Sequence, residues 1–224
     1  MGTLYVIATP IGNLHDISAR AISVLKEVYV IAAEDTRVSK RLLMEYGVST
    51  PMISYHAQSK DSARDGIVKR LAEGNDVALI TDAGTPGISD PGTELVRFAR
   101  DAGFSVVTVP GPSALTAALS IAGIPTNQFT FLGFLPHKKG RETLFKEISE
   151  SDRTMVFYES PHRIMKTLLR LSELLGEDKR ISIFRELTKI HEEVVEGSAA
   201  EVLQYFVENE EHIRGEFVVA VSSK

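Results

Sequence analysis

The chain has 224 residues, of which 43% are hydrophobic and 25% charged, and it contains no cysteine. This mix is typical of a globular protein, and the lack of cysteine excludes disulfide scaffolds, thiol nucleophiles and cysteine-ligated zinc. A net charge of −5 argues against a nonspecific nucleic-acid binder. The first residues lack the basic segment of a signal peptide, and no apolar run approaches the roughly 20 residues that span a bilayer. We therefore expect a cytoplasmic protein with no membrane partner and no metal site.

Strands and helices alternate through the first half of the chain. Apolar runs predict strands at 4–8, 28–33, around Ile53, at 77–80 and at 105–109. Helical spacing fills the intervals between them, beginning at about Ser18 with a buried stripe that includes Ala21 and Leu25. Because this alternation is typical of parallel sheets, we expect a first α/β domain, residues 1–125, with a mostly parallel sheet.

The second half has a different pattern. Strands are predicted at 129–134, 154–158, 180–185, 192–196 and 217–221, and helices at 139–148, from 164 to about 175, and at 199–207. Some neighbouring strands have no helix between them, which indicates a mixed sheet. The helix breakers at 123–125 place the boundary, so the second α/β domain is expected at residues 126–224.

The most informative segment is the loop at residues 81–92, which follows the apolar strand at 77–80 and precedes a helix. An ordinary connection of this kind needs only about two to six residues. This one is longer and rich in glycine and proline, which allow close backbone approach to a ligand and hold the loop's shape. Because open α/β sheets bind ligands at the carboxyl ends of strands, the loop predicts a ligand site with Asp82 at its mouth. It matches neither a Walker loop nor G-x-G-x-x-G.

Other polar clusters also follow predicted strands, and together they are expected to line one cleft edge. With the glycine loop they form six motifs: ATPIGNL at 8–14, AEDTR at 33–37, TDAGTPGISDPG at 81–92, PGPSA at 110–114, GFLP at 133–136 and YESPHR at 158–163. These motifs resemble those of the small-subunit ribosomal RNA cytidine 2′-O-methyltransferases, a family within the tetrapyrrole methylase superfamily. The resemblance extends from Met1 to about Ser222. Family members often continue into a small C-terminal extension beyond this point. We expect donor binding not to require such an extension, and RNA binding to be the property that its absence affects.

The resemblance implies two α/β domains with the methyl donor S-adenosylmethionine in the cleft between them, and a homodimer. By position, the donor would contact Pro10, Thr81, Asp82, Ala83, Gly84, Ile88, Ser113, Ala114, Tyr158 and Leu187. The chemistry of the residues agrees with this, because Gly84 allows close backbone approach to adenosine or ribose. A sulfonium cation also favours nearby oxygens and carboxylates over lysine.

The implied reaction is attack of a ribose 2′-hydroxyl on the methyl carbon of the donor. Asp35 is a candidate general base and Arg37 a candidate phosphate ligand, both at the end of a predicted strand. The alternative is that the two side chains pair with each other or cap the next helix. Further candidate contacts to ribosomal RNA are Lys138, Lys139, Arg141, His162 and Arg163, and the alternative for these is an ordinary solvated surface.

Two other functions remain open from the sequence. A methyltransferase of the same fold could act on a tetrapyrrole or another small acceptor, although such an enzyme would not need the basic residues between 138 and 170. A non-catalytic nucleotide-binding module would bind the donor without turnover, and it would leave the clusters at 34–37 and 158–163 unexplained.

Overall fold

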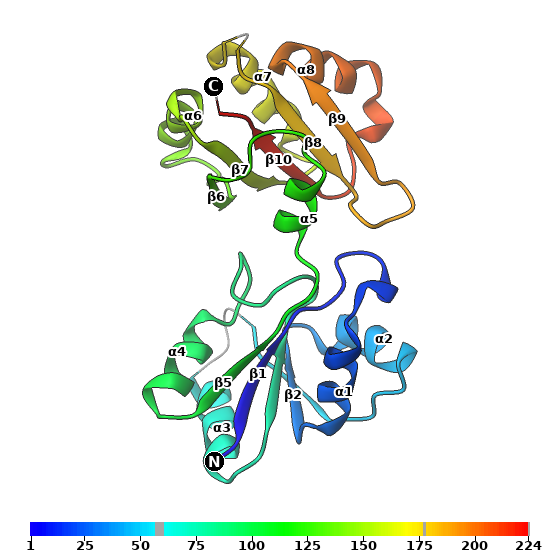
Figure 1. Ribbon diagram of the computed structural model, residues 1–224, viewed down its shortest axis with the longest axis vertical. Helices are drawn as coiled ribbons and strands as arrows, with labels where there is room; N and C mark the ends of the chain where they lie inside the picture. The colour runs from blue at the N-terminus through cyan, green and yellow to red at the C-terminus, as the bar shows by residue number, and fades with distance from the viewer. Residues whose placement is uncertain (57–60, 177, 224) are drawn as a thin grey trace. The chain divides into compact units, whose positions relative to one another are not determined.

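The computed structural model describes residues 1–56, 61–176 and 178–223. The chain forms two compact units, Met1–Ser113 and Ala114–Lys224 (Figure 1). This division falls earlier than the boundary expected after Pro125. It assigns α5 (Ala114–Ser120) to the second unit, where the helix contacts β10 (Phe217–Val221).

The first unit is built on a five-stranded sheet in the order β3-β2-β4-β1-β5. Its strands are β1 (Thr3–Ile7), β2 (Val30–Ala33), β3 (Met52–Ser54), β4 (Val77–Ile80) and β5 (Ser105–Val109). Each pairing between these strands is parallel, which confirms the expected parallel sheet. The central strands β2 and β4 are buried along their whole length, because helices cover both faces of the sheet.

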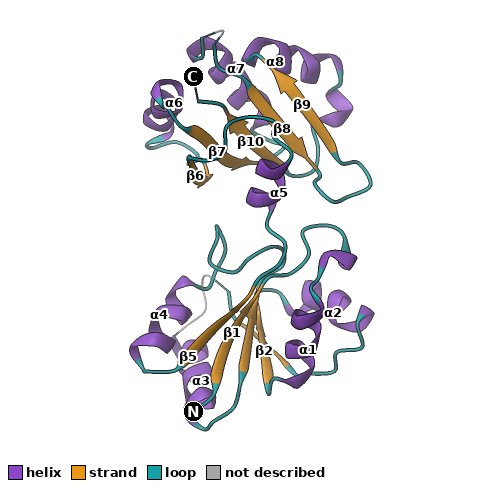
Figure 2. Ribbon diagram, in the orientation of Figure 1, coloured by secondary structure: helices purple, strands orange, loops and turns teal. Residues whose placement is uncertain are grey.

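Helices cover the two faces of this sheet in pairs (Figure 2). On one face, α1 (Ala19–Glu27) and α2 (Thr36–Glu45) pack in a cluster with buried strand residues such as Ile7. On the other, α3 (Asp61–Ala72) and α4 (Thr93–Asp101) pack in a second cluster with residues such as Leu4. The predicted start of α1 is confirmed, because the side chain of Ser18 accepts a hydrogen bond from the Ala21 N–H.

The second unit has a five-stranded mixed sheet in the order β6-β7-β10-β8-β9. Its further strands are β6 (Phe129–Phe134), β7 (Thr154–Glu159), β8 (Ile181–Arg185) and β9 (Glu193–Gly197). The β6–β7 pair is parallel and the other pairs are antiparallel, as the mixed-sheet prediction requires. One hydrophobic cluster joins this sheet to α6 (Arg141–Glu150), α7 (Ile164–Leu174) and α8 (Ala199–Glu208).

The strand directions decide which loops share an edge of each sheet. In the first unit all carboxyl ends lie at one edge, which gathers the loops at 8–13, 34–35, 81–92 and 110–113. In the second, β7 and β8 both run antiparallel to β10, so their carboxyl ends share an edge with that of β6. The loops at 135–140, 160–163 and 186–192 therefore also gather at one edge.

Within the residues that the structure describes, no helix has the length and apolar character that crossing a membrane requires.

Candidate functional site

The order in which strands are added to the first unit's sheet reverses at the neighbouring strands β1 and β4. After β1 the chain continues to α1 on one face of the sheet, and after β4 it continues to α4 on the opposite face. Connections that leave adjacent strands in opposite directions open a crevice at their carboxyl ends, which is where open α/β sheets bind ligands. The glycine loop predicted as a ligand site begins at this point.

Thr9 fastens the loop after β1 to the loop after β4. Its backbone N–H donates to the Gly84 carbonyl at 2.9 Å, and the Gly84 N–H donates back to the Thr9 carbonyl at 3.0 Å. Its hydroxyl Oγ1 donates to the Thr81 carbonyl at 3.0 Å. Gly84 adopts a φ of +75°, a conformation that favours glycine. Both threonines are buried, and these hydrogen bonds tie both ends of the segment 81–84 to the loop after β1.

The loop after β5 is joined to the same assembly. The Thr85 hydroxyl donates to the Pro112 carbonyl at 3.2 Å. A Cβ on Gly111 would lie 3.2 Å from the Ala8 Cβ, so a side chain there would crowd the loop after β1. The backbones of three loops thus approach one another closely, with the half-buried Ser113 at the end of the third.

The predicted donor contacts of the first unit differ in accessibility. Pro10, Thr81 and Gly84 are buried, whereas Asp82 and Ala83 are exposed and Ile88 is 41% exposed. The structure brings the first loop and the segment 81–84 together through Thr9. The loop backbones lie so close together that a Cβ at Gly111 would crowd Ala8, and polar and apolar groups are exposed beside them. This arrangement suits a ligand made of a nucleoside joined to an amino acid.

The carboxylates of Glu34, Asp82 and Asp90 interact at this edge, and only Asp82 was predicted individually as part of the ligand site. The backbone N–H of Asp35 donates to Asp82 Oδ1 at 3.0 Å, and the N–H of Asp82 lies 3.4 Å from Glu34 Oε2. Burial raises the pKa of Glu34. Burial, and then the charges of Glu34 and Asp82, raise the pKa of Asp90 to about 6. This concentration of negative charge is compatible with a bound sulfonium cation.

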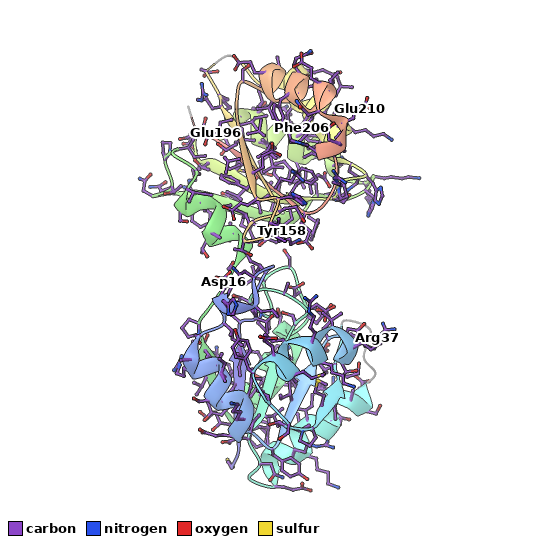
Figure 3. All side chains as sticks on the ribbon, turned by 90° about the vertical axis from the view of Figure 1, so that its right-hand side faces the viewer. Asp16, Arg37, Tyr158, Glu196, Phe206 and Glu210 are labelled. Atoms are coloured by element: carbon purple, nitrogen blue, oxygen red, sulfur yellow. The ribbon has the colours of Figure 1, made fainter. Side chains whose placement is uncertain are left out.

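Asp35 and Arg37 pair with each other and start α2. Arg37 Nη2 lies 2.6 Å from Asp35 Oδ2 and its Nε 3.1 Å from Oδ1, while the Arg37 N–H donates to Oδ1 at 2.8 Å. The hydrogen bonds from Arg37 lower the pKa of Asp35 to about 2. The Arg37 side chain is 88% exposed. Figure 3 shows it at the surface of the first unit. Both parts of the alternative offered by the sequence, pairing and helix capping, are therefore present.

Glu159, which was not among the predicted site residues, is the centre of a hydrogen-bond network at the edge of the second unit. Its side chain is fully buried at the end of β7, where it accepts hydrogen bonds from the Thr167 hydroxyl at 2.7 Å and from the Ser160 N–H at 2.9 Å. Arg163 Nη2 lies 2.6 Å from Oε1, and Arg141 Nη2 lies 3.0 Å from Oε2. Two guanidinium groups from separate elements thus converge on one carboxylate.

This network gives internal partners to two of the predicted RNA ligands. Arg141 and Arg163 have side chains that are only 14% and 16% exposed. Each also donates to a backbone carbonyl at the end of β6: Arg163 to Leu135 at 2.7 Å and Arg141 to Pro136 at 3.2 Å. The other three predicted RNA contacts, Lys138, Lys139 and His162, have exposed side chains.

The second unit contains three predicted donor contacts. Ala114 is half-buried at the start of α5, and the other two lie at the same edge of the sheet. Tyr158 is half-buried in β7, and Leu187 is buried just after β8. Leu187 lies between Glu186 and Thr188, which have φ values of 52° and 66°. Such backbone is rare for residues other than glycine and is often found at ligand sites, and a single sequence gives no signal for it.

Comparisons with known proteins agree with these observations. Residues 3–203 match the family described as tetrapyrrole (corrin/porphyrin) methylases. A relative from Xylella fastidiosa, named ribosomal RNA small subunit methyltransferase I, is 49% identical over 222 residues, which are 98% of this chain and 81% of the relative.

Solved structures share the fold at low sequence identity. A cobalamin biosynthetic enzyme, cobalt precorrin-4 methyltransferase, has a TM-score of 0.72 at 17% identity, covering 98% of this chain and 94% of the other. A uroporphyrin-III C-methyl transferase from Thermus thermophilus, complexed with S-adenyl homocysteine, has a TM-score of 0.67 at 17% identity, covering 99% and 97%. The resemblance read from the six motifs is thereby confirmed, and the chain belongs to the tetrapyrrole methylase family.

Proposed function

We propose that this chain is an S-adenosylmethionine-dependent methyltransferase that modifies small-subunit ribosomal RNA, at the 2′-hydroxyl of a cytidine ribose. The observation that carries the proposal is the 49% identity, over 98% of this chain, to a relative named as a small-subunit ribosomal RNA methyltransferase. The cytidine ribose as acceptor rests on the resemblance of the six motifs.

The geometry of the first unit supports the donor. Thr9, Gly84 and Gly111 bring three loop backbones together at the carboxyl ends of the strands, where open α/β sheets generally bind ligands. Glu34, Asp82 and Asp90 place negative charge there, and the donor supplies an electrophilic methyl group on a sulfonium cation. The structural neighbour from Thermus thermophilus is complexed with S-adenyl homocysteine, the demethylated form of this donor.

The reaction requires that the hydroxyl lie in line with the methyl group and that its proton leave. Positioning and exclusion of water supply most of the acceleration in such a transfer. Asp35 as general base remains a prediction, and its pairing with Arg37 makes it a weak base. If Asp35→Ala retained full turnover and only weakened RNA binding, Asp35 would have no role as base.

The RNA side of the proposal depends on the second unit as well as on Arg37. Lys138, Lys139 and His162 are the predicted contacts whose side chains are exposed there. We further propose that the enzyme acts as a homodimer in the cytoplasm, where small subunits are assembled.

The decisive experiment is methyl transfer from labelled S-adenosylmethionine to purified small ribosomal subunits that lack the modification, with protein-free RNA in parallel. Label on a single cytidine ribose is the expected result. Label on neither substrate, with donor binding intact by calorimetry, would overturn the RNA acceptor. A tetrapyrrole such as uroporphyrinogen, assayed alongside, distinguishes the alternative acceptor from a module that only binds the donor.

A further inference from the structure

The edge strand β6 contains an irregularity just before its last residue. Its register against β7 shifts between Phe131 and Phe134, and Gly133 within that shift has a φ of 63°. In a regular strand, residues three apart point to opposite faces. Here the rings of Phe131 and Phe134 both contact the ring of Tyr158, at centroid distances of 5.0 and 5.4 Å. The bulge has therefore turned Phe134 to the face that Phe131 occupies.

Phe134 is therefore an exposed aromatic ring that packs against a second ring, that of Tyr158. Both contacts to Tyr158 are edge-to-face, with interplanar angles of 68° and 63°. Phe131 and Tyr158 are half-buried, whereas Phe134 is 56% exposed. A large apolar side chain placed on the surface by a local distortion, and held there by a second ring, is suited to contact with a planar partner.

A basic loop without carboxylates follows this ring directly. Residues 135–140 read LPHKKG, and His137, Lys138 and Lys139 are all exposed. Among the described residues, Lys138 and Lys139 form no ion pair with an acidic side chain. The nearby Glu142 is engaged by Arg170 at 2.8 Å, and Glu159 is buried between its two arginines. The charge next to Phe134 is therefore positive.

The loop is fixed to the body of the unit at the two residues between the ring and the cations. The Leu135 carbonyl accepts from Arg163 and the Pro136 carbonyl from Arg141, and both arginines are bound to Glu159. The Leu135 side chain is itself buried. Ring and cations thus share one rigid anchor, which reduces the entropy lost when a ligand binds.

We propose that Phe134 stacks on an unpaired base of the RNA substrate, while Lys138 and Lys139 bind the phosphates beside that base. This inference rests on the proposed function and deepens it, because it assigns a recognition surface for single-stranded RNA. An aromatic ring next to basic side chains matches the chemistry of RNA with unstacked bases, and double-helical RNA does not present its bases in this way.

The test compares Phe134→Ala with Phe134→Trp and with a matched control, Phe129→Ala. Phe129 is a 41% exposed ring on the same edge strand, before the bulge. Stacking contributes about 1–3 kcal/mol per base, so Phe134→Ala should raise the KM for small subunits about fivefold or more. Phe134→Trp and Phe129→Ala should stay within about twofold of the wild type. The affinity for S-adenosylhomocysteine, measured by calorimetry, should be unchanged in all three.

The lysines are tested by the salt dependence of binding. A fluorescently labelled single-stranded fragment of small-subunit ribosomal RNA is titrated with the wild type, with Phe134→Ala and with the double variant Lys138→Ala/Lys139→Ala. Each lost phosphate contact to a single strand should reduce the magnitude of the negative slope of log K against log salt by about 0.7. The slope of the double variant is therefore expected to be shallower by about 1.4. Phe134→Ala should bind more weakly with an unchanged slope.

The outcomes show whether this inference, the proposed function or both fail. Methyl transfer with an unchanged KM in Phe134→Ala would overturn the inference alone. Weaker binding of S-adenosylhomocysteine by Phe134→Ala would assign the ring to the donor, and an altered sedimentation mass would assign it to a second copy of the chain; either would overturn the inference. RNA binding that depends on Phe134 without any methyl transfer would support it and overturn the proposed function. If the wild type bound no RNA and transferred no methyl group, both would fall.

Discussion

Asp90 lies half-buried in the glycine loop and interacts with the charges of Glu34 and Asp82. Its pKa of about 6 is above the ordinary value of 3.8, so folding favours its protonated form. A raised pKa stabilises the fold below pH 4, and this contribution is lost as the pH rises through about 6. At pH 8 the ionised carboxylate therefore destabilises the native loop.

Asp90→Asn is expected to increase the free energy of unfolding by about 1 kcal/mol at pH 8, a value reduced from the full shift because the group is partly solvated. At pH 4 the variant and the wild type should have equal stability. Urea unfolding at the two pH values measures this, with Asp152→Asn, an exposed loop carboxylate in the other unit, as the control. Equal effects of Asp90→Asn at pH 4 and pH 8 would contradict the assignment.

Glu159 binds two arginines at the edge of the second unit that carries predicted donor and RNA contacts. Removing one partner of a buried ion pair costs about 3–5 kcal/mol, because the remaining charge stays buried. Glu159→Gln keeps the shape and leaves two arginine side chains without their carboxylate, so we expect a loss near the lower end, about 3 kcal/mol. Thermal unfolding measures it. Glu142→Gln breaks the ion pair with the partly exposed Arg170 and should cost less than about 1 kcal/mol.

At the scale of elements, Thr9 joins the ends of β1 and β4, where the donor site is predicted. Thr9→Val has nearly the same shape but lacks the hydroxyl that donates to the buried Thr81 carbonyl. We expect a loss of about 1–3 kcal/mol in stability, because a buried carbonyl loses its partner. The affinity for S-adenosylhomocysteine should fall several-fold, since the segment 81–84 is held less firmly.

Thr108→Val is the matched control for this prediction, because Thr108 is an exposed threonine on β5 of the same sheet. It should leave both stability and donor affinity close to those of the wild type. If Thr9→Val lowered stability without changing donor affinity, the hydrogen bond to Thr81 would support the fold and have no part in binding.

The elements themselves were largely predictable, whereas their side-chain partners were not. Apolar runs predicted β4 and β10 with their observed bounds, because buried strands need continuous hydrophobic sequence. The inward orientation of Arg141 and Arg163 could not be predicted, since it depends on Glu159 being buried and pairing with residues 18 and 4 positions away. The bulge at Gly133 and the left-handed backbone at Glu186 and Thr188 are likewise set by tertiary packing.

At the scale of the whole molecule, the buried apolar side chains separate by unit. Among the residues that the structure describes, two hydrophobic clusters lie in the first unit and one in the second. Leu71 is fully buried in α3 of the first unit, and Phe157 is fully buried in β7 of the second. Truncating such side chains costs about 2–5 kcal/mol. Each truncation should therefore destabilise mainly its own unit.

Hydrogen exchange measured peptide by peptide tests this in Leu71→Ala and Phe157→Ala, each serving as the control for the other. Each variant should lose protection in its own unit and keep it in the other unit. Equal loss in both units would mean that they unfold together.

The predicted donor contacts include Thr81 in one unit and Tyr158 and Leu187 in the other, so bound S-adenosylhomocysteine should raise protection in both. At about 100 times its Kd, a ligand adds about 2.7 kcal/mol to the free energy of global unfolding. Protection confined to the first unit would remove Tyr158 and Leu187 from the donor site.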